Sequence, residues 1–440
     1  MVKNNRIPLP LSENNSIQLT DSIRLLRLLS DCGGSSLTYL GEDKAGKCIV
    51  KEIYPVESKL PLSREQKFVK IDGGTTEQQD ELRVRLAERA KEEAETARKL
   101  YQDGYGEDGG TNSIFSFGCE ILNPDELQEE FRGTAAQYLV INTCTGLTMD
   151  EYVKRLAVKS PEYALSLEQA LTLTDAILQS VQFFHEKQKM LHLDLKPDNC
   201  YFPTQLEHTF AILLDCGSAQ PIDQAEKMER ISVSAGYTSY EVKQLASNMK
   251  NMNQEEEGAY RKLIGPHSDL ASVGYILFHL LLKTEPVLSW IRASVGNDEA
   301  QVEVNVDSLF WGLYQCSLQS ELEDHLHQYL LPGLEVPYPY LAERICRMVS
   351  RAVYIPEKME LSELRKGRFE NCKLFRDEIR MIREILEEKG AHPEVLASAS
   401  RKVFLNMVQD DPELDHTEDP IGNENLYHQE WFTPVAKAKK

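Results

Sequence analysis

Short apolar runs bounded by Gly, Asp or Pro recur in the first third of the chain. Each has the length and the flanking residues of a β-strand. The runs lie at residues 23–29, 37–40, 47–53, 113–122 and 136–142. Residues 77–101 are rich in Glu, Arg, Ala and Leu without Gly or Pro, which predicts one long helix. This order predicts a small α+β lobe.

After Gly146 the pattern becomes helical. Residues 149–157 and 167–186 are amphipathic, and residues 211–214 predict a short strand. Helices are predicted at residues 270–283, 340–354 and 368–389. Beyond Gly390 the chain is polar and acidic, and we interpret it as a tail.

The bulk composition describes an ordinary globular protein of 440 residues, with 41% hydrophobic and 27% charged residues. The net charge of −21 argues against binding to nucleic acid or to an anionic membrane surface. Nine dispersed cysteines without metal-ligand spacing fit reduced thiols. No secretory signal and no apolar run of ~20 residues is apparent, so a soluble, cytoplasmic protein without a membrane span is expected.

The most informative segment is residues 192–199, His-Leu-Asp-Leu-Lys-Pro-Asp-Asn. It places the carboxylate of Asp194, the amine of Lys196 and the amide of Asn199 on one short loop. Sixteen residues after Asn199, Asp215 follows an apolar run and precedes Cys-Gly. A proton acceptor, a cation and two oxygen ligands are what phosphoryl transfer with a metal ion requires.

These residues resemble two motifs of eukaryotic-like (Hanks-type) Ser/Thr protein kinases, in particular the bacterial group. The octapeptide resembles the catalytic loop HRDLKxxN, and Asp215-Cys-Gly resembles DFG. Leu193 replaces the usual Arg, which argues against control through a phosphorylated activation loop, and Cys216 replaces Phe. The resemblance implies a bilobal protein-kinase-like α+β fold with a β-rich N-lobe and a helical C-lobe.

The resemblance divides the chain into four regions. They are an N-terminal extension at 1–17, the N-lobe at 18–145, the C-lobe at 146–390, and an acidic tail of uncertain order at 391–440. The implied cofactors are ATP and Mg²⁺. Asp194 is the candidate proton acceptor, Lys196 the cation for the transferring phosphate, and Asn199 and Asp215 the metal ligands.

The N-lobe offers a nucleotide-binding cation. Residues 48–52, Cys-Ile-Val-Lys-Glu, resemble the Val-Ala-Ile-Lys strand of kinases, so Lys51 is the candidate that reaches the phosphates. Its carboxylate partner would be Glu93, although Glu92 and Glu95 compete with it. Residues 57–80 are interpreted as an insertion.

Two further nucleotide-binding stretches follow from the resemblance. Gly33, Gly34 and Ser35 stand where kinases have a glycine-rich phosphate loop, although Ser30 and Cys32 replace two glycines. Residues 137–148 resemble the fifth strand and the hinge. Ile141 would be the gatekeeper, and the backbone from Asn142 to Cys144 would bind adenine.

The segment after Asp215 ends in a pattern that resembles GTxxYxAPE. Ser234 takes the Thr position and is expected to hydrogen-bond Asp194 and Lys196. Tyr237 takes the Tyr position, Tyr240 replaces Pro, and Glu241 closes the motif with Arg368 as its candidate partner.

Residues 268–278 resemble DxWSxGxxL at the start of a buried helix. Asp269 is expected to bond the backbone of the catalytic loop. His192 is expected to pack in the core, and His185 is interpreted as structural. Residues 242–265 are interpreted as an insertion, with 251–262 solvated.

Three functions from different classes remain open. The first is a Ser/Thr protein kinase that acts on a protein substrate and on itself. The second is a pseudokinase that serves as a nucleotide-binding or interaction scaffold; the sparse glycine loop, Leu193, Cys216 and Tyr240 favour it. The third is a small-molecule phosphotransferase that shares the spacing from Asp194 to Asn199.

Overall fold

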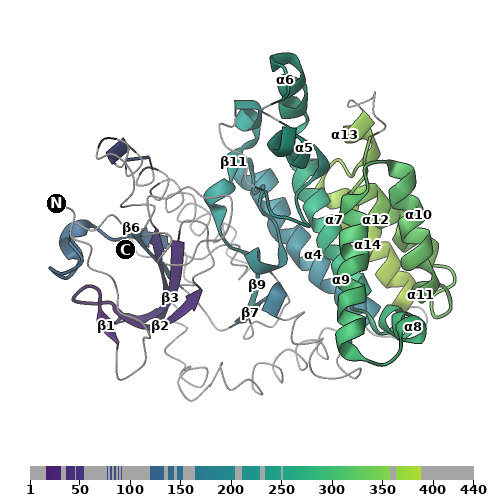
Figure 1. Ribbon diagram of the computed structural model, residues 1–440, viewed down its shortest axis with the longest axis horizontal. Helices are drawn as coiled ribbons and strands as arrows, with labels where there is room; N and C mark the ends of the chain where they lie inside the picture. The colour runs from purple at the N-terminus through teal and green to yellow at the C-terminus, as the bar shows by residue number, and fades with distance from the viewer. Residues whose placement is uncertain are drawn as a thin grey trace, which may run out of the picture. The chain divides into compact units, whose positions relative to one another are not determined.

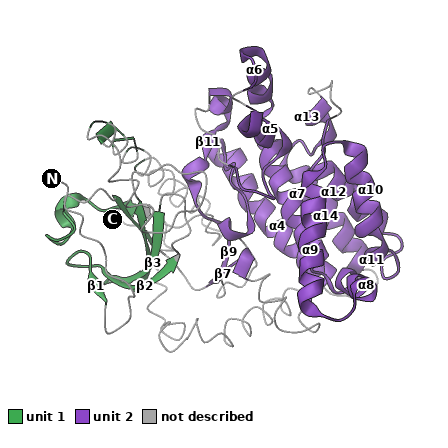
Figure 2. Ribbon diagram, viewed as in Figure 1, with its two compact units in different colours: residues 1–145, 416–440 green, residues 146–415 purple. Residues whose placement is uncertain are grey.

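The computed structural model divides into two compact units, which Figure 2 distinguishes by colour. Unit 1 comprises residues 1–145 and 416–440, and unit 2 comprises residues 146–415. The described residues are 16–30, 36–44, 46–53, 77, 80, 81, 84, 85, 88, 91, 119–132, 137–142, 146–151, 164–203, 211–227, 233–248, 251–356 and 363–387.

Unit 1 is built on an antiparallel sheet with the strand order β1-β2-β3-β4-β6-β5; Figure 1 labels β1, β2, β3 and β6. Its strands are β1 (Ile17–Gln18), β2 (Arg24–Ser30), β3 (Ser36–Glu42), β4 (Lys47–Ile53), β5 (Cys119–Ile121) and β6 (Gln137–Asn142). These strands confirm the apolar runs predicted in this part of the chain. The fourth run is much longer than its strand, and its residues 113–118 lie outside the described residues.

Alternation along the strands gives this sheet two faces. In β3 and β4 every second residue is buried, and four of these residues join one core cluster. The cluster contains Leu37, Tyr39, Cys48, Val50, Tyr138 and Val140, together with residues from β2 and from 122–131. The strand periodicity therefore decides which residues of β4 are buried on this face.

The predicted helix at residues 77–101 is helical at each of its described positions, from Glu77 to Lys91. All of these side chains are exposed. Glu93, the candidate partner of Lys51, lies outside the described residues.

Unit 2 is mainly helical (Figure 1). Its helices are α4 (Leu167–Phe183), α5 (Tyr240–Asn248), α6 (Gln254–Leu263), α7 (Pro266–Leu282), α8 (Glu285–Val295), α9 (Glu299–Gln315), α10 (Gln319–Tyr329), α11 (Leu331–Glu335), α12 (Ala342–Ala352), α13 (Glu363–Gly367) and α14 (Cys372–Glu387). Helix α4 begins at Ser166, whose side chain accepts from Gln169 N–H while Gln169 reaches back to Ser166 N–H.

Helix α7 is the centre of unit 2. It is buried on nearly all sides and packs against α4, α5, α8, α9 and α12. A helix that is apolar all round must lie in the interior, which explains its position. Gly274 allows close packing here, because a Cβ at that position would lie 2.6 Å from the Ala352 Cβ of α12.

Unit 2 also contains short strands, which lie before α4 and between α4 and α5 in the chain. One sheet has the order β10-β9-β7, formed by Ile212–Leu213, Cys200–Pro203 and Gly146–Thr148. The other pairs β11 (Gln220–Pro221) with β8 (Met190–Leu191). No described helix combines the length and the apolar character needed to cross a membrane.

One sequence interpretation is wrong in part. Residues 251–262 are not simply solvated, because they contain most of α6 and pack against other elements. The capping box of Asn253 and Glu256 is exposed, but Met252 and Tyr260 are half-buried against an apolar cluster. Isolated apolar residues in an acidic run gave no periodic signal of this contact.

Candidate functional site

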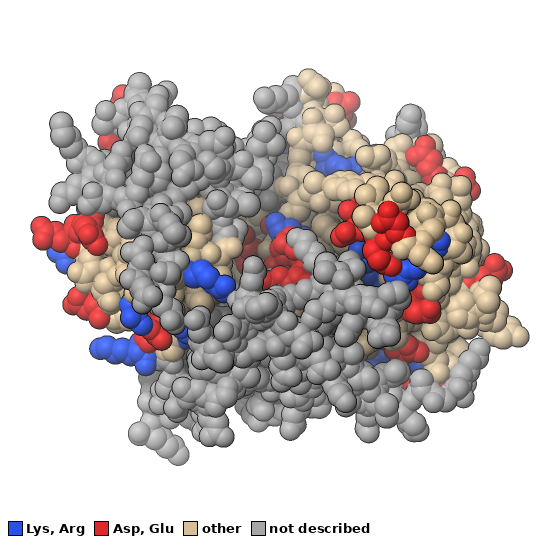
Figure 3. All heavy atoms as spheres, turned by 60° about the horizontal axis from the view of Figure 1, so that its bottom comes forward, with Lys and Arg blue, Asp and Glu red and all other residues tan. Residues whose placement is uncertain are grey.

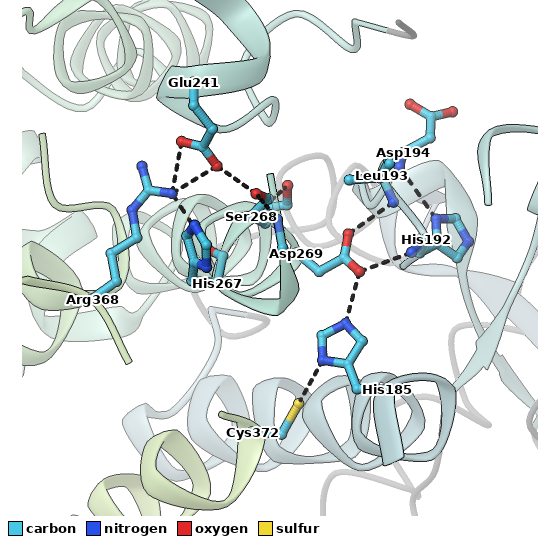
Figure 4. A network of polar contacts seen from close by, with 12 residues as sticks. His185, His192, Leu193, Asp194, Glu241, His267, Ser268, Asp269, Arg368 and Cys372 are labelled. Carbon is cyan, nitrogen blue, oxygen red and sulfur yellow. Dashed lines mark hydrogen bonds and ion pairs between the residues drawn. The ribbon is translucent and has the colours of Figure 1, made fainter. Parts of the chain in front are cut away.

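The loop at 192–196 is held by a buried carboxylate. Asp269, in the first turn of α7, accepts from His192 N–H through Oδ2 and from Leu193 N–H through Oδ1, both at 2.8 Å (Figure 4). This confirms the predicted contact. Leu193 has a left-handed backbone at φ 60°, a costly conformation for a branched residue, and the second bond fixes it there.

A histidine and its neighbours complete this anchor. His185 Nε2 lies 2.8 Å from Asp269 Oδ2, and His185 Nδ1 lies 3.7 Å from Cys372 Sγ on α14. Burial raises the pKa of Asp269, but the hydrogen bond and charge of His185 and the nearby His192 outweigh it, so the pKa is lowered. His192 is fully buried against Phe184, as predicted.

Three polar side chains converge on Asp194. The Ser234 hydroxyl donates to Asp194 Oδ1, and Lys196 Nζ lies 3.5 Å from Asp194 Oδ2 and 3.3 Å from Ser234 Oγ. Asn199 Nδ2 donates to the Asp194 carbonyl at 2.8 Å and to Asp194 Oδ2 at 3.1 Å. The predicted contacts of Ser234 with Asp194 and Lys196 are thereby confirmed. A carboxylate oriented by this set of donors can accept a proton from a hydroxyl group.

Asn199 and Asp215 are brought together by paired strands. Strands β9 and β10 are antiparallel, Leu213 lies opposite Cys200, and Leu214 N–H donates to the Asn199 carbonyl at 2.9 Å. Because the Asn199 amide nitrogen faces Asp194, its amide oxygen points the other way. Asp215 is exposed and has a left-handed backbone at φ 57°. An amide oxygen and a carboxylate are suitable ligands for a hard divalent cation.

Among the described residues, no three His, Cys, Asp or Glu side chains lie together so that they could hold a metal. The pair of Asn199 and Asp215 supplies only one residue of these types.

A second buried network closes the segment from 215 to 241, called the activation segment below. Arg368 Nη1 donates to both Glu241 oxygens at 3.0 and 2.9 Å, and Ser268 Oγ donates to Glu241 Oε1 at 2.5 Å (Figure 4). The predicted pairing of Glu241 with Arg368 is confirmed. Burial raises the pKa of Glu241. The charges of Arg368 and His267 and the hydrogen bond from Ser268 lower it by more, so the net shift is downward.

Sequence reasoning missed the aromatic contact beneath Tyr237. Its ring lies 5.1 Å from Phe310 of α9, and its hydroxyl lies 2.7 Å from His279 Nδ1. Gly236 has φ +91°, and a Cβ there would lie 2.8 Å from Phe310 Cε1. In the sequence, the cluster of aromatic residues at 310–314 could have indicated this contact, but nothing there pointed to Tyr237 as its partner.

Lys51 lies in the central part of the unit 1 sheet. It pairs with Thr38 of β3 and Leu139 of β6, so these three residues share one face. Glu52 points to the opposite face, where it accepts from Tyr39 Oη at 2.7 Å and Tyr138 Oη at 2.9 Å. The burial of Glu52 was not predicted from the sequence, because Glu52 was treated only as the residue that follows Lys51 in the motif.

Several candidate residues are not tested by the structure. Gly33, Gly34, Ser35, Glu93 and Cys144 lie outside the described residues. Asn142 ends β6 opposite Cys48. Lys51 and Asp194 belong to different units, so their meeting in one site stays a prediction.

Comparison with known proteins agrees with this geometry. Residues 126–328 match the family model described as "Protein kinase domain". "Calcium/calmodulin-dependent serine/threonine-protein kinase 1" of Oryza sativa subsp. japonica is 26% identical over 193 residues, which is 44% of this chain and 28% of that protein. "CDPK-related kinase 3" of Arabidopsis thaliana is 25% identical over 174 residues, 40% of this chain and 25% of that protein.

A third relative, "Calcium-dependent protein kinase 16" of Oryza sativa subsp. japonica, is 27% identical over 181 residues, 41% of this chain and 28% of that protein. The chain thus spans less than a third of each of these relatives. The family match confirms the kinase resemblance and the predicted α+β fold, whereas the narrower resemblance to the bacterial group stays a prediction.

Proposed function

We propose that this chain, which contains a protein kinase domain of the Hanks type, transfers the γ-phosphoryl group of ATP to Ser and Thr hydroxyls of a protein substrate. The observation that carries the proposal is the convergence of Lys196, Asn199 and Ser234 on Asp194. Self-phosphorylation is part of the same proposal.

In this proposal Asp194 orients the substrate hydroxyl and accepts its proton. Lys196 stays within reach of the carboxylate and of the incoming phosphoryl group, whose charge it offsets. Ser234, in the activation segment, hydrogen-bonds both Asp194 and Lys196 and so fixes their relative position. Lys two residues after Asp is the pattern that favours Ser and Thr over Tyr as acceptors, by the same resemblance.

Protein kinase domains in general use ATP with a divalent metal. Here Asn199 and Asp215 would hold Mg²⁺, which would neutralise charge on the phosphates. Lys51, oriented by Glu93, would bind the phosphates together with Gly33, Gly34 and Ser35. Backbone groups of Asn142 and Cys144 would bind adenine. Residues 18–145 and 146–390 would be the two lobes.

The scaffold alternative deserves the same test, because Leu193, Cys216 and Tyr240 depart from the kinase pattern. A scaffold would bind ATP without transfer. The positions that would contact phosphate, metal or the transferred proton all carry the residue types of the kinase pattern. They are Lys51, Asp194, Lys196, Asn199 and Asp215. We therefore favour the enzyme.

The test is transfer from labelled ATP by the purified chain onto itself and onto a basic Ser/Thr peptide. Acidic side chains form several groups on the described surface seen in Figure 3, and the net charge is −21, so a basic peptide is the suitable probe. Wild type is expected to transfer, whereas Lys51→Met and Asp215→Ala are expected to be inactive.

If wild type and Asp194→Asn are equally silent while ATP still raises the melting temperature, the scaffold alternative holds. Transfer to an aminoglycoside or choline but not to protein would support a small-molecule phosphotransferase. An Asp215→Ala protein with unchanged kcat would contradict the metal assignment.

A further inference from the structure

An apolar cluster surrounds Leu193, the residue next to Asp194. Its buried members come from three separate parts of the chain, and three half-buried residues pack against them. The buried members are Leu191, Leu193, Ala225, Val242, Leu245 and Ile264, and the half-buried ones are Ile222, Met252 and Tyr260. The cluster therefore joins the catalytic loop, the activation segment with α5, and the insertion that contains α6.

The cluster holds the activation segment on both sides. Before its middle, Ile222 and Ala225 of the 3₁₀-helix η7 (Ile222–Lys227) belong to the cluster, and Ile222 N–H donates to the Lys189 carbonyl at 2.9 Å. Directly after the segment ends at Glu241, Val242 and Leu245 of α5 belong to the cluster. Helix α6 also packs directly on η7.

Two departures from the kinase pattern meet in this contact. Leu193 contributes a buried side chain with 9% exposure where the pattern has Arg. Tyr240, which stands in the position of Pro, begins α5, which packs against α6, and burial and the nearby Tyr260 of α6 raise the pKa of its hydroxyl. The insertion therefore supplies a neighbour for one unusual residue and an apolar surface that packs with the other.

We propose that residues 251–265 of the insertion form a built-in clamp, in which Tyr260 and Met252 act as positioning residues that hold the activation segment against the catalytic loop without phosphorylation. The proposal rests on the kinase function proposed above. An apolar side chain at position 193 cannot bind a phosphate, but it can bury surface against η7 and α5. Leu193 and Tyr240 are then parts of one device and not marks of lost catalysis.

The first test removes the clamp side chain. Tyr260→Ala is expected to lower kcat for peptide phosphorylation about tenfold, with KM for ATP changed by about twofold or less, because Asp194 and Ser234 lose their alignment. Tyr260→Phe keeps the ring in the cluster, so it is expected to recover most of the rate. Tyr340→Ala is the matched control, because Tyr340 is 81% exposed.

A second readout does not depend on activity. Amide hydrogen exchange of residues 220–227 is expected to be faster in Tyr260→Ala than in wild type, while exchange in α14 is unchanged. Unchanged kcat together with unchanged exchange at 220–227 would overturn the clamp.

The third test removes phosphate from the protein. Wild type treated with phosphatase, with its mass checked for complete removal, is expected to keep its full initial rate on peptide. If the untreated protein is active and the treated protein is silent, the clamp is overturned while the kinase function stands. If both are silent, the kinase function fails and the clamp fails with it.

Discussion

Asp269 and Glu241 are both fully buried carboxylates of unit 2, yet they are stabilised in different ways. Asp269 accepts two backbone N–H groups of the catalytic loop and faces His185. Glu241 is paired with the guanidinium of Arg368. Asp269 is bound to the loop that it positions. Glu241 is bound to the charged side chain of Arg368, which lies 127 residues away along the chain. Loss of the first should affect catalysis, and loss of the second should affect stability.

The largest expected effect is from breaking the ion pair. Arg368→Met leaves Glu241 buried with its charge uncompensated, which should lower the free energy of unfolding by about 3–5 kcal/mol. Urea denaturation of Arg347→Met provides the control, because its pair with Glu343 is exposed and should contribute less than about 1 kcal/mol. Equal losses in the two variants would contradict the assigned role of the buried pair.

A pH change probes the same network more gently. Burial lowers the pKa of His267 from 6.5 to about 4, so the folded state favours the neutral ring. Stability from this group is present above pH 6.5 and is lost as the pH falls toward 4, by up to ~1.4 kcal/mol per pH unit.

The measurement is the slope of unfolding free energy between pH 6.5 and 5 in wild type and in His267→Gln. Burial also lowers the pKa of His279, to about 3, so wild type and variant share that contribution and only their difference matters. The variant should have the shallower slope, and identical slopes would refute the assignment.

An effect on catalysis and not on stability is expected from the other carboxylate. Asp269→Asn replaces one acceptor oxygen by an NH₂ group that faces a backbone N–H, either that of His192 or that of Leu193, which should loosen the loop there. We expect kcat to fall about thirtyfold, ~2 kcal/mol in the barrier, with a smaller change in KM. Asp324→Asn, on the exposed side of α10, should have no such effect. An Asp269→Asn protein with wild-type kcat would show that the loop does not need this anchor.

Much of the site in unit 2 could be predicted from short motifs. The contacts of Ser234, Asp269 and Glu241 follow from their motif positions. Ser234 and Asp269 bond to the catalytic loop, and Glu241 bonds to Ser268 of α7 and to Arg368. The alternating strands of unit 1 were also predictable, since burial there follows a period of two.

Other parts left no local signal. Helices α8 to α11 were not predicted, and the burial of Tyr260 and Met252 depends on residues of η7 and α5 that are distant in the chain. Glu52 is stabilised by two tyrosines on neighbouring strands, a contact that depends on strand register and not on its own neighbours in sequence.

The most direct test of the central claim is the rate of a single turnover with saturating ATP and peptide, measured in wild type, Asp194→Asn and Asp324→Asn. If Asp194 accepts the substrate proton, Asp194→Asn should be slower by about 100-fold or more while Asp324→Asn matches wild type. An Asp194→Asn protein that transfers phosphate at the wild-type rate would contradict the account.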